Sequence, residues 1–271
     1  MEIKEKKIYI PVNYLEFKDK KTLSILINLF YWKNNDNLVN ITLDKIIKDC
    51  GYTPQSGEGR TTDKFKLALS YLQEQNIIEC DIIFKNITLK QLVTIKLENY
   101  DKNKKHIVIF YSDYKKIIED KVKSTMKDNM ILLYLMIKKG IGAKNYKDEE
   151  IKYKSLTNDT LMKRCEVSKD TLNGCLKELG GLGLICYDNI GYIIKNNKCR
   201  KASNVYALTY DNLELGLKAS KKYYEDRGYT FETNKNKLKR FEKTIKDWSE
   251  DDMELSVHDL QMIEIMNLLD Y

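Results

Sequence analysis

The strongest constraint on how this chain of 271 residues folds is a ten-residue pattern that occurs twice, at residues 41–50 and 156–165. The segments align without gaps, and four aligned pairs are identical: Thr42 and Thr157, Asp44 and Asp159, Lys48 and Lys163, Cys50 and Cys165. In each copy a threonine precedes the apolar residues and an aspartate follows it, which is typical of a helix N-cap with an acid in the first turn. The pattern therefore predicts a short helix after each threonine.

A second helix is predicted behind each copy, starting from Ser168 and from Thr61, which are both favourable N-cap residues. Apolar residues recur at helical spacing in both segments, so one face packs on a core and the other stays polar. The two apolar stripes are Leu172, Leu176 and Leu179, and Phe65, Leu69 and Leu72. The turn between the two helices is eight residues longer in the first copy, where it spans residues 51–60. Each copy thus contains a helix-turn-helix.

The repeat extends on both sides of the helix-turn-helix. Upstream, a short strand (7–14 and 106–114) leads through a polar turn to an apolar helix (22–32 and 125–138). Downstream, an apolar pair opens a β-hairpin wing in each copy. The first wing pairs 78–84 with 87–97 across Lys85 and Asn86, and the second pairs 184–187 and 192–194 with 205–209. A helix, a helix-turn-helix and a hairpin wing together make up a winged-helix unit.

We therefore expect an α+β, mainly helical chain with two tandem winged-helix domains, at residues 1–100 and 101–210. Residues 211–271 are expected to form a helical C-terminal segment with an acidic tail, with helical patterns at 211–227, 236–248 and 257–269. The last of these carries an apolar stripe, which either docks on the domains or contacts a partner.

The distribution of charge favours a polyanionic partner. The formal net charge is +7, but residues 249–271 contain seven acidic residues and no Lys or Arg, so the rest of the chain carries +14. A basic body of this kind predicts binding to double-stranded DNA, and a solvated lysine surface is the alternative interpretation.

No sequence feature points to catalysis, so we expect a protein that is not an enzyme and that needs no cofactor or metal. There is no G-x-x-x-x-G-K-[ST] loop for a nucleotide triphosphate, and the two histidines, His106 and His258, are too far apart to pair as the metal ligands of a nicking enzyme. The six cysteines lack C-x-x-C spacing, which predicts reduced core thiols in a cytoplasmic protein. No signal peptide and no apolar run near the roughly 20 residues that span a bilayer are present, so no membrane contact is expected.

Candidate DNA contacts follow from the helix-turn-helix, because its second helix enters the major groove and its outward polar residues face base edges and phosphates. Gly174 on that face permits close approach of the backbone. The wings add cations for phosphates, most densely at 195–201, with four cations in seven residues. The candidates in the first domain are Arg60, Thr62, Lys64, Lys66, Ser70, Lys85 and Asn86. Those in the second are Lys163, Arg164, Ser168, Lys169, Thr171, Asn173, Lys177, Lys195, Asn197, Lys198, Arg200 and Lys201.

The segment LTNDTLMKRCEVSKDTLNGCLKELGGLGLI at residues 156–185 resembles the tandem winged-helix replication initiators (Rep-type) of plasmids and phages from low-GC Gram-positive bacteria. The similarity spans about residues 7–210. It implies that each domain reads repeats at a replication origin and that conversion between dimer and monomer controls initiation. By this resemblance Ser168, Lys169, Asn173 and Lys177 contact the origin, with Thr62 and Lys66 in the other domain.

Other functions share the same sequence features. A transcriptional regulator of a mobile element, or a partition or relaxosome accessory protein, would carry the same helix-turn-helix segments. A fourth possibility is a scaffold that uses winged helices to dock proteins. The partners expected are double-stranded DNA, a second copy of the chain in a homodimer, and host replication proteins bound through the C-terminal helices.

Overall fold

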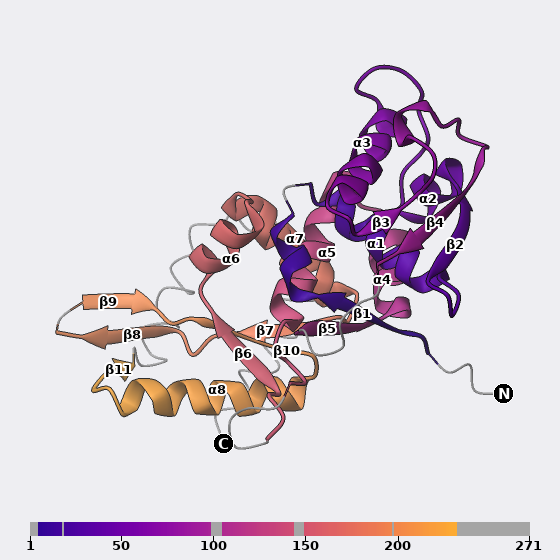
Figure 1. Cartoon of the computed structure of the whole chain (residues 1–271). Helices are drawn as coiled ribbons and strands as arrows, with labels where there is room; N and C mark the ends of the chain where they lie inside the picture. Colours follow the sequence, from indigo (N-terminus) through magenta and orange to yellow (C-terminus); the bar gives the residue numbers. More distant parts are fainter. Residues whose placement is uncertain (1–4, 18, 99–104, 144–148, 197, 232–271) are drawn as a thin grey trace. The chain divides into compact units, whose positions relative to one another are not determined.

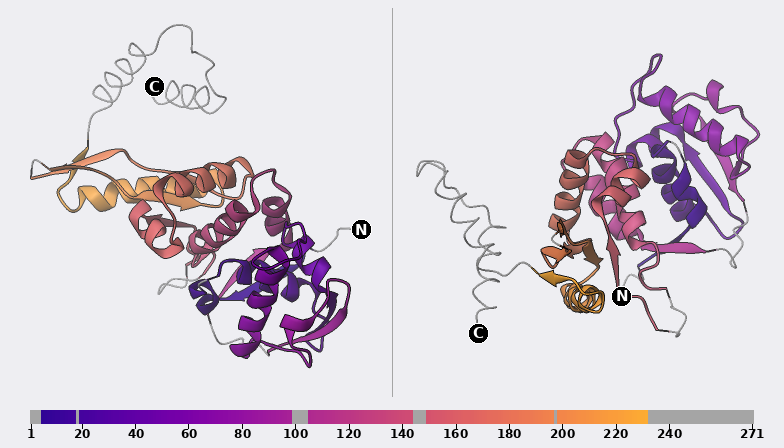
Figure 2. Two further views of the ribbon diagram at one scale, coloured as in Figure 1. Left: turned by 90° about the horizontal axis from the view of Figure 1, so that it is seen from above. Right: turned by 90° about the vertical axis from the view of Figure 1, so that its left-hand side faces the viewer.

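The computed structural model describes residues 5–17, 19–98, 105–143, 149–196 and 198–231. As the sequence predicts, these residues form an α+β fold, with eight α-helices and four small antiparallel sheets (Figures 1 and 2). The chain divides into two compact units. Of the described residues, those within 5–190 and 202–223 belong to the first, and those within 191–201 and 224–231 belong to the second. The domain boundaries at residues 100 and 210 remain predictions, since both copies of the repeat lie mostly in the first unit.

The first copy of the repeat contains four strands, three α-helices and two short 3-10 helices. In chain order these are β1 (Lys7–Pro11), η1 (Val12–Glu16), α1 (Lys21–Trp32), β2 (Leu38–Thr42), α2 (Leu43–Asp49), α3 (Thr61–Glu74), β3 (Ile78–Glu79), η2 (Phe84–Asn86) and β4 (Leu92–Leu97). Strand β4 lies in the centre of a three-stranded sheet with the order β2-β4-β3.

The second copy repeats this order. Its elements are β5 (His106–Phe110), α4 (Tyr111–Glu119), α5 (Ser124–Lys138), β6 (Tyr153–Leu156), α6 (Asn158–Cys165), α7 (Lys169–Gly181), β7 (Cys186–Asp188), β8 (Tyr192–Lys195), β9 (Lys198–Lys201) and β10 (Asn204–Ala207). The sheet order β6-β10-β7 matches β2-β4-β3, and α6 and α7 correspond to α2 and α3. The predicted helices at 22–32 and 125–138 are confirmed as α1 and α5 to within one residue.

The helix ends are built alike in the two copies. The hydroxyls of Thr42 and Thr157 each accept a hydrogen bond from the backbone three residues on, as the sequence predicts. Asn76 lies two residues after the end of α3 and Gly183 two residues after the end of α7, and both have positive φ. The backbone nitrogen of the next residue in each case donates to the carbonyl five positions earlier. That arrangement satisfies the last carbonyls of the helix. Ser168 caps α7 as predicted, with its hydroxyl accepting from the backbone of Thr171.

The predicted N-cap of α3 is wrong. Thr61 is not the N-cap of α3: Arg60 occupies that position with no side-chain hydrogen bond, and Thr61 is the first helical residue. The long turn supplies the missing acceptor, since the backbone nitrogen of Thr62 donates to the carbonyl of Gln55.

The pairing of both wings also differs from the prediction. In the first copy β3 pairs with β4 through Ile78 and Leu97, and Lys85 and Asn86 belong to the 3-10 helix η2 rather than to a two-residue turn. The apolar residues Phe84 and Ile87 are buried and hold this loop against the core, which explains why an apolar run does not continue as a strand. In the second copy β7 pairs with β10, but β8 pairs with β9 and not with residues 205–209.

The two copies share one hydrophobic core. Strand β1 pairs with β5 in antiparallel register, from Lys7 opposite Phe110 to Pro11 opposite His106. Helices α1 and α5, which are buried along most of their length, lie in the same cluster of apolar side chains as α3 and α7. Figure 1 shows β1 and β5 side by side where the copies meet. The position of one helix-turn-helix relative to the other is therefore fixed by packing.

Helix α8 (Tyr210–Glu225) confirms the helix predicted at 211–227. It packs on β6 and β10 through Leu213 and Leu217, and Gly216 permits the close approach, because a Cβ at this position would lie 2.5 Å from Val205 Cγ1. In the second unit β8 lies between β9 and β11 (Thr230–Phe231). The helices predicted at 236–248 and 257–269 lie outside the described residues, and no described helix has both the length and the apolar character needed to cross a bilayer.

Candidate nucleic-acid interface

Helix α7 presents the clearest candidate surface for DNA. Its apolar stripe is buried as predicted: Leu172 and Leu179 are fully enclosed. Lys169, Asn173 and Lys177 are exposed at spacings of four residues, so they form one continuous row along the outward face. Ser168 is also exposed at the N-terminus of this helix, and Thr171 is half-buried.

Gly174 does not lie in this exposed row, contrary to the prediction. A Cβ at Gly174 would lie 3.3 Å from Met126 Cε, so this residue faces α5 and permits the two helices to pack closely. Cys165 and Cys175 are also buried, and burial raises the pKa of each thiol to about 11. These thiols are thus core residues with little thiolate at neutral pH.

Helix α3 exposes a different face from the one that alignment with α7 assigns to it. Thr62, which aligns with Lys169, is only 5 % exposed, because the long turn folds over the start of the helix. Lys66 and Ser70, which align with Asn173 and Lys177, are half-buried. The ammonium group of Lys66 donates to the backbone carbonyl of Lys85 at 3.2 Å, so η2 covers this side of α3. Thr62 is therefore covered rather than exposed as predicted, and Lys66 is partly engaged by η2.

The exposed residues of α3 are Lys64, Leu67 and Glu74, and Arg60 is exposed at its N-cap. Leu67 is 69 % exposed in the middle of the helix, a position that the sequence analysis left out. The signal for it is present in the sequence, since an apolar residue two positions after Phe65 falls off the buried stripe. Lys85 and Asn86 are exposed on η2 beside this helix.

The basic segment at 195–201 forms a hairpin in the second unit. Strands β8 and β9 pair from Tyr192 opposite Lys201 to Lys195 opposite Lys198. Lys195 and Arg200 both contact Tyr229: the Lys195 ammonium lies 5.1 Å and the Arg200 guanidinium 5.4 Å from the centre of its ring. Arg200 also donates to the Tyr229 hydroxyl at 3.1 Å. Lys198 and Lys201 are exposed, and the predicted contact Asn197 lies outside the described residues.

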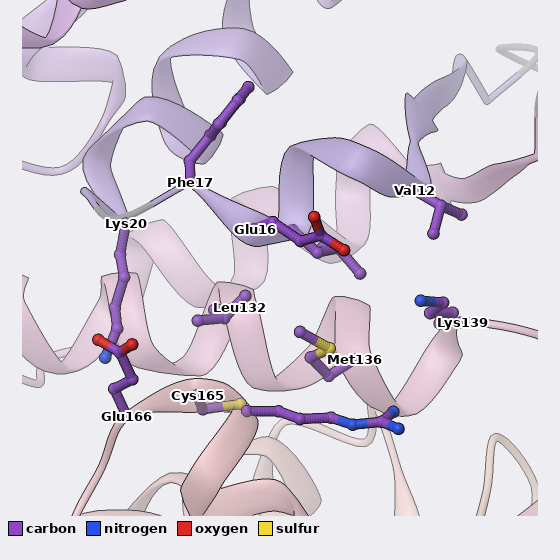
Figure 3. Close-up of a pocket in the computed structure, with 11 residues that line it drawn as sticks. Val12, Glu16, Phe17, Lys20, Leu132, Met136, Lys139, Cys165 and Glu166 are labelled. Atoms are coloured by element: carbon purple, nitrogen blue, oxygen red, sulfur yellow. The ribbon is translucent and has the colours of Figure 1, made fainter.

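Lys163 and Arg164 are exposed at the end of α6, and Arg164 lines a cavity of about 350 Å³ (Figure 3). Lys20 and Lys139 line the same cavity, together with the carboxylates Glu16 and Glu166, and all four are labelled in Figure 3. Burial, followed by the positive charges of Arg164 and Lys139, lowers the pKa of nearby Lys154. Three cations and two carboxylates therefore line this cavity. The sequence analysis missed Lys20 and Lys139, because both are distant in the sequence from α6.

Within the described residues no three His, Cys, Asp or Glu side chains are grouped as metal ligands. Neither the known protein-family models nor the curated proteins contain a match to this chain.

Proposed function

We propose that the chain is a sequence-specific binding protein for double-stranded DNA, built on two tandem winged-helix domains, and that it acts as a replication initiator of a plasmid or phage. The main support is the duplicated helix-turn-helix, in which α3 and α7 each carry an exposed face on one shared core. Two recognition helices at a fixed separation would select a fixed spacing between two half-sites.

The chemistry of the exposed helix faces suits base reading. Asn173 on α7 can pair with adenine through two hydrogen bonds, and the flanking lysines Lys169 and Lys177 can reach guanine or phosphate. On α3 the exposed apolar side chain of Leu67 suits a thymine methyl group. We expect α7 to contribute more of the sequence discrimination than α3. The α3 residues that align with Lys169, Asn173 and Lys177 are buried or half-buried.

Selection of bound duplexes from a randomised pool, repeated at two salt concentrations, tests this function. We expect one enriched sequence with two parts at constant spacing, and an affinity that falls steeply as salt rises. Enrichment of sites that occur as direct repeats in a replicon origin supports the initiator. A single palindrome at a promoter instead supports a transcriptional regulator.

If the chain is instead a scaffold that docks proteins, the duplex selection should give a different result. It would enrich no duplex at either salt concentration, and this outcome would remove DNA binding from the proposal. The matched variant for the selection is Lys116→Ala with Lys121→Ala, since both lysines are exposed in and after α4, away from α3 and α7 in the sequence. This variant should enrich the same sequence as the natural chain.

A further inference from the structure

We propose that a groove beside β1 binds a nucleotide, with its phosphate groups on a set of lysines and its base against Tyr9. The groove has a volume of about 830 Å³ and lies in the first unit, between β1 and the turn that joins α1 to β2. Its size is sufficient for a nucleotide, since ligand pockets span about 300–1,000 Å³. This site is separate from the proposed duplex-reading helices.

The lining of the groove is strongly cationic. Lys7 is the first residue of β1, Lys6 immediately precedes it, and Lys33 is the C-cap residue of α1. No Asp or Glu is present among the lining residues in the part of the chain that the structure describes. Three asparagines of the α1–β2 turn add amide groups that can donate to phosphate oxygens: Asn34, Asn35 and Asn37.

Two of these lysines are each held by a hydrogen bond. The Lys6 ammonium donates to the carbonyl of Tyr31, and the Lys33 ammonium donates to Asn37 Oδ1 at 2.7 Å. Burial lowers the pKa of both, and the positive charge of Lys6 further lowers the pKa of Lys33. The two like charges therefore repel each other. An anion bound beside them would relieve this repulsion, and a phosphate chain supplies several charged oxygens.

An aromatic surface adjoins the lysines. Tyr9 is 47 % exposed on the outward side of β1, and its ring packs edge-on against His106 at a centroid distance of 5.1 Å. An exposed ring next to clustered cations is the combination that binds nucleotides without regard to base identity, because every base offers a flat face for stacking. Inorganic phosphate alone would use the lysines but not Tyr9.

The nucleotide can be free in solution or part of a single strand, and the experiment separates the two sources. Binding to the full chain is measured by calorimetry with ATP, with inorganic triphosphate, and with an oligothymidylate of twelve residues. We expect Lys6→Gln with Lys33→Gln to weaken every ligand by about tenfold or more. Tyr9→Ala should weaken ATP and the oligonucleotide by about fivefold or more and leave triphosphate unchanged.

Matched variants keep the result interpretable. Lys116→Gln with Lys121→Gln removes the same charge at exposed positions outside the groove and should retain all binding. Lys169→Ala with Lys177→Ala tests the duplex-reading row and should also retain it, so failure of one proposal is distinguishable from failure of the other. Thermal unfolding of each variant checks that it folds.

Each outcome is decisive. Binding of ATP assigns a free nucleotide, and binding of the oligonucleotide alone assigns a single strand. Absence of binding by all three ligands overturns the proposal. So does an affinity that is unchanged in the Lys6→Gln and Lys33→Gln variant, or one that falls equally in the Lys116→Gln and Lys121→Gln variant.

Discussion

The side-chain amide of Asn28 in α1 donates a 2.7 Å hydrogen bond to the hydroxyl of Tyr114 in α4, and this bond joins the two copies of the repeat inside the core. Both side chains are buried. The Asn28 carbonyl accepts from Tyr111 at 3.1 Å, while Tyr114 donates to the carbonyl of Asp49 at the end of α2. One buried asparagine thus connects α1, α2 and α4. Because these hydrogen bonds form in only one arrangement of the helices, they make the packing of the two copies more specific than apolar contacts alone would.

Tyr114→Phe should lower the free energy of unfolding by about 1–2 kcal/mol, since it removes one acceptor from Asn28 and one donor from Asp49. Asn28→Leu should cost more, about 3 kcal/mol, because two tyrosine hydroxyls then lose a partner in a buried site. Urea denaturation measures both. Tyr210→Phe, at a position that is 78 % exposed, is the control and should leave stability unchanged. Equal stability of Tyr114→Phe and the natural chain would show that the bond does not hold the copies together.

Asp128 in α5 makes stability depend on pH. It is 4 % exposed, and its carboxylate accepts from Tyr52 and, at 3.3 Å, from Ser24. Burial outweighs these bonds and the charge of Lys21, and it raises the pKa of Asp128 from 3.8 to about 6. The folded state then holds more protons than the unfolded state between these values. The free energy of unfolding should therefore fall as pH rises from about 4 to about 6, by on the order of 3 kcal/mol.

Asp128→Asn tests this dependence, because an amide keeps an acceptor for Tyr52 without a charge. The variant should be more stable than the natural chain at pH 7 and should lose most of the change between pH 4 and 6. Denaturation across this pH range measures it, with Asp36→Asn at an exposed turn position as the control. A natural chain whose stability rises with pH through this window would contradict the raised pKa.

Local signals in the sequence predicted the elements that depend on neighbours in the chain. The caps at Thr42 and Ser168 and the apolar stripes of α3 and α7 follow from periodicity and side-chain chemistry within one helix. Contacts between segments that are distant in the sequence could not be predicted from such local signals. Covering of Thr62 by the long turn, and of Lys66 by η2, depends on tertiary packing. The sequence alone therefore predicted which face of α7 is exposed, but for α3 it predicted a face that the long turn and η2 partly cover.

Gly216→Ala should destabilise the packing of α8 on the sheet by about 1–3 kcal/mol, as overpacking of a core does. The added Cβ would lie 2.5 Å from Val205 and 2.7 Å from Tyr153, so one of these side chains must move. Gly181→Ala is the matched control, since its Cβ meets no atom within 4 Å at the end of α7. Alanine there should stabilise the helix by up to about 1 kcal/mol. Thermal unfolding that shows equal effects at the two positions would contradict the tight contact at Gly216.

Lys169→Ala with Lys177→Ala should weaken binding to the selected duplex while the fold is kept, because both side chains are exposed. The way in which affinity falls identifies the contacts. A base contact costs about 1–3 kcal/mol and relaxes specificity at one position, whereas a phosphate contact weakens all sequences alike and lowers the salt slope by about one. Fluorescence anisotropy with the selected duplex and with single-base variants, at several salt concentrations, separates the two. Asn173→Ala should act like a loss of base reading and change the preference at an adenine. If the double variant binds with full affinity and Lys116→Ala does as well, α7 does not face the duplex, and the exposed row of lysines is only solvated surface.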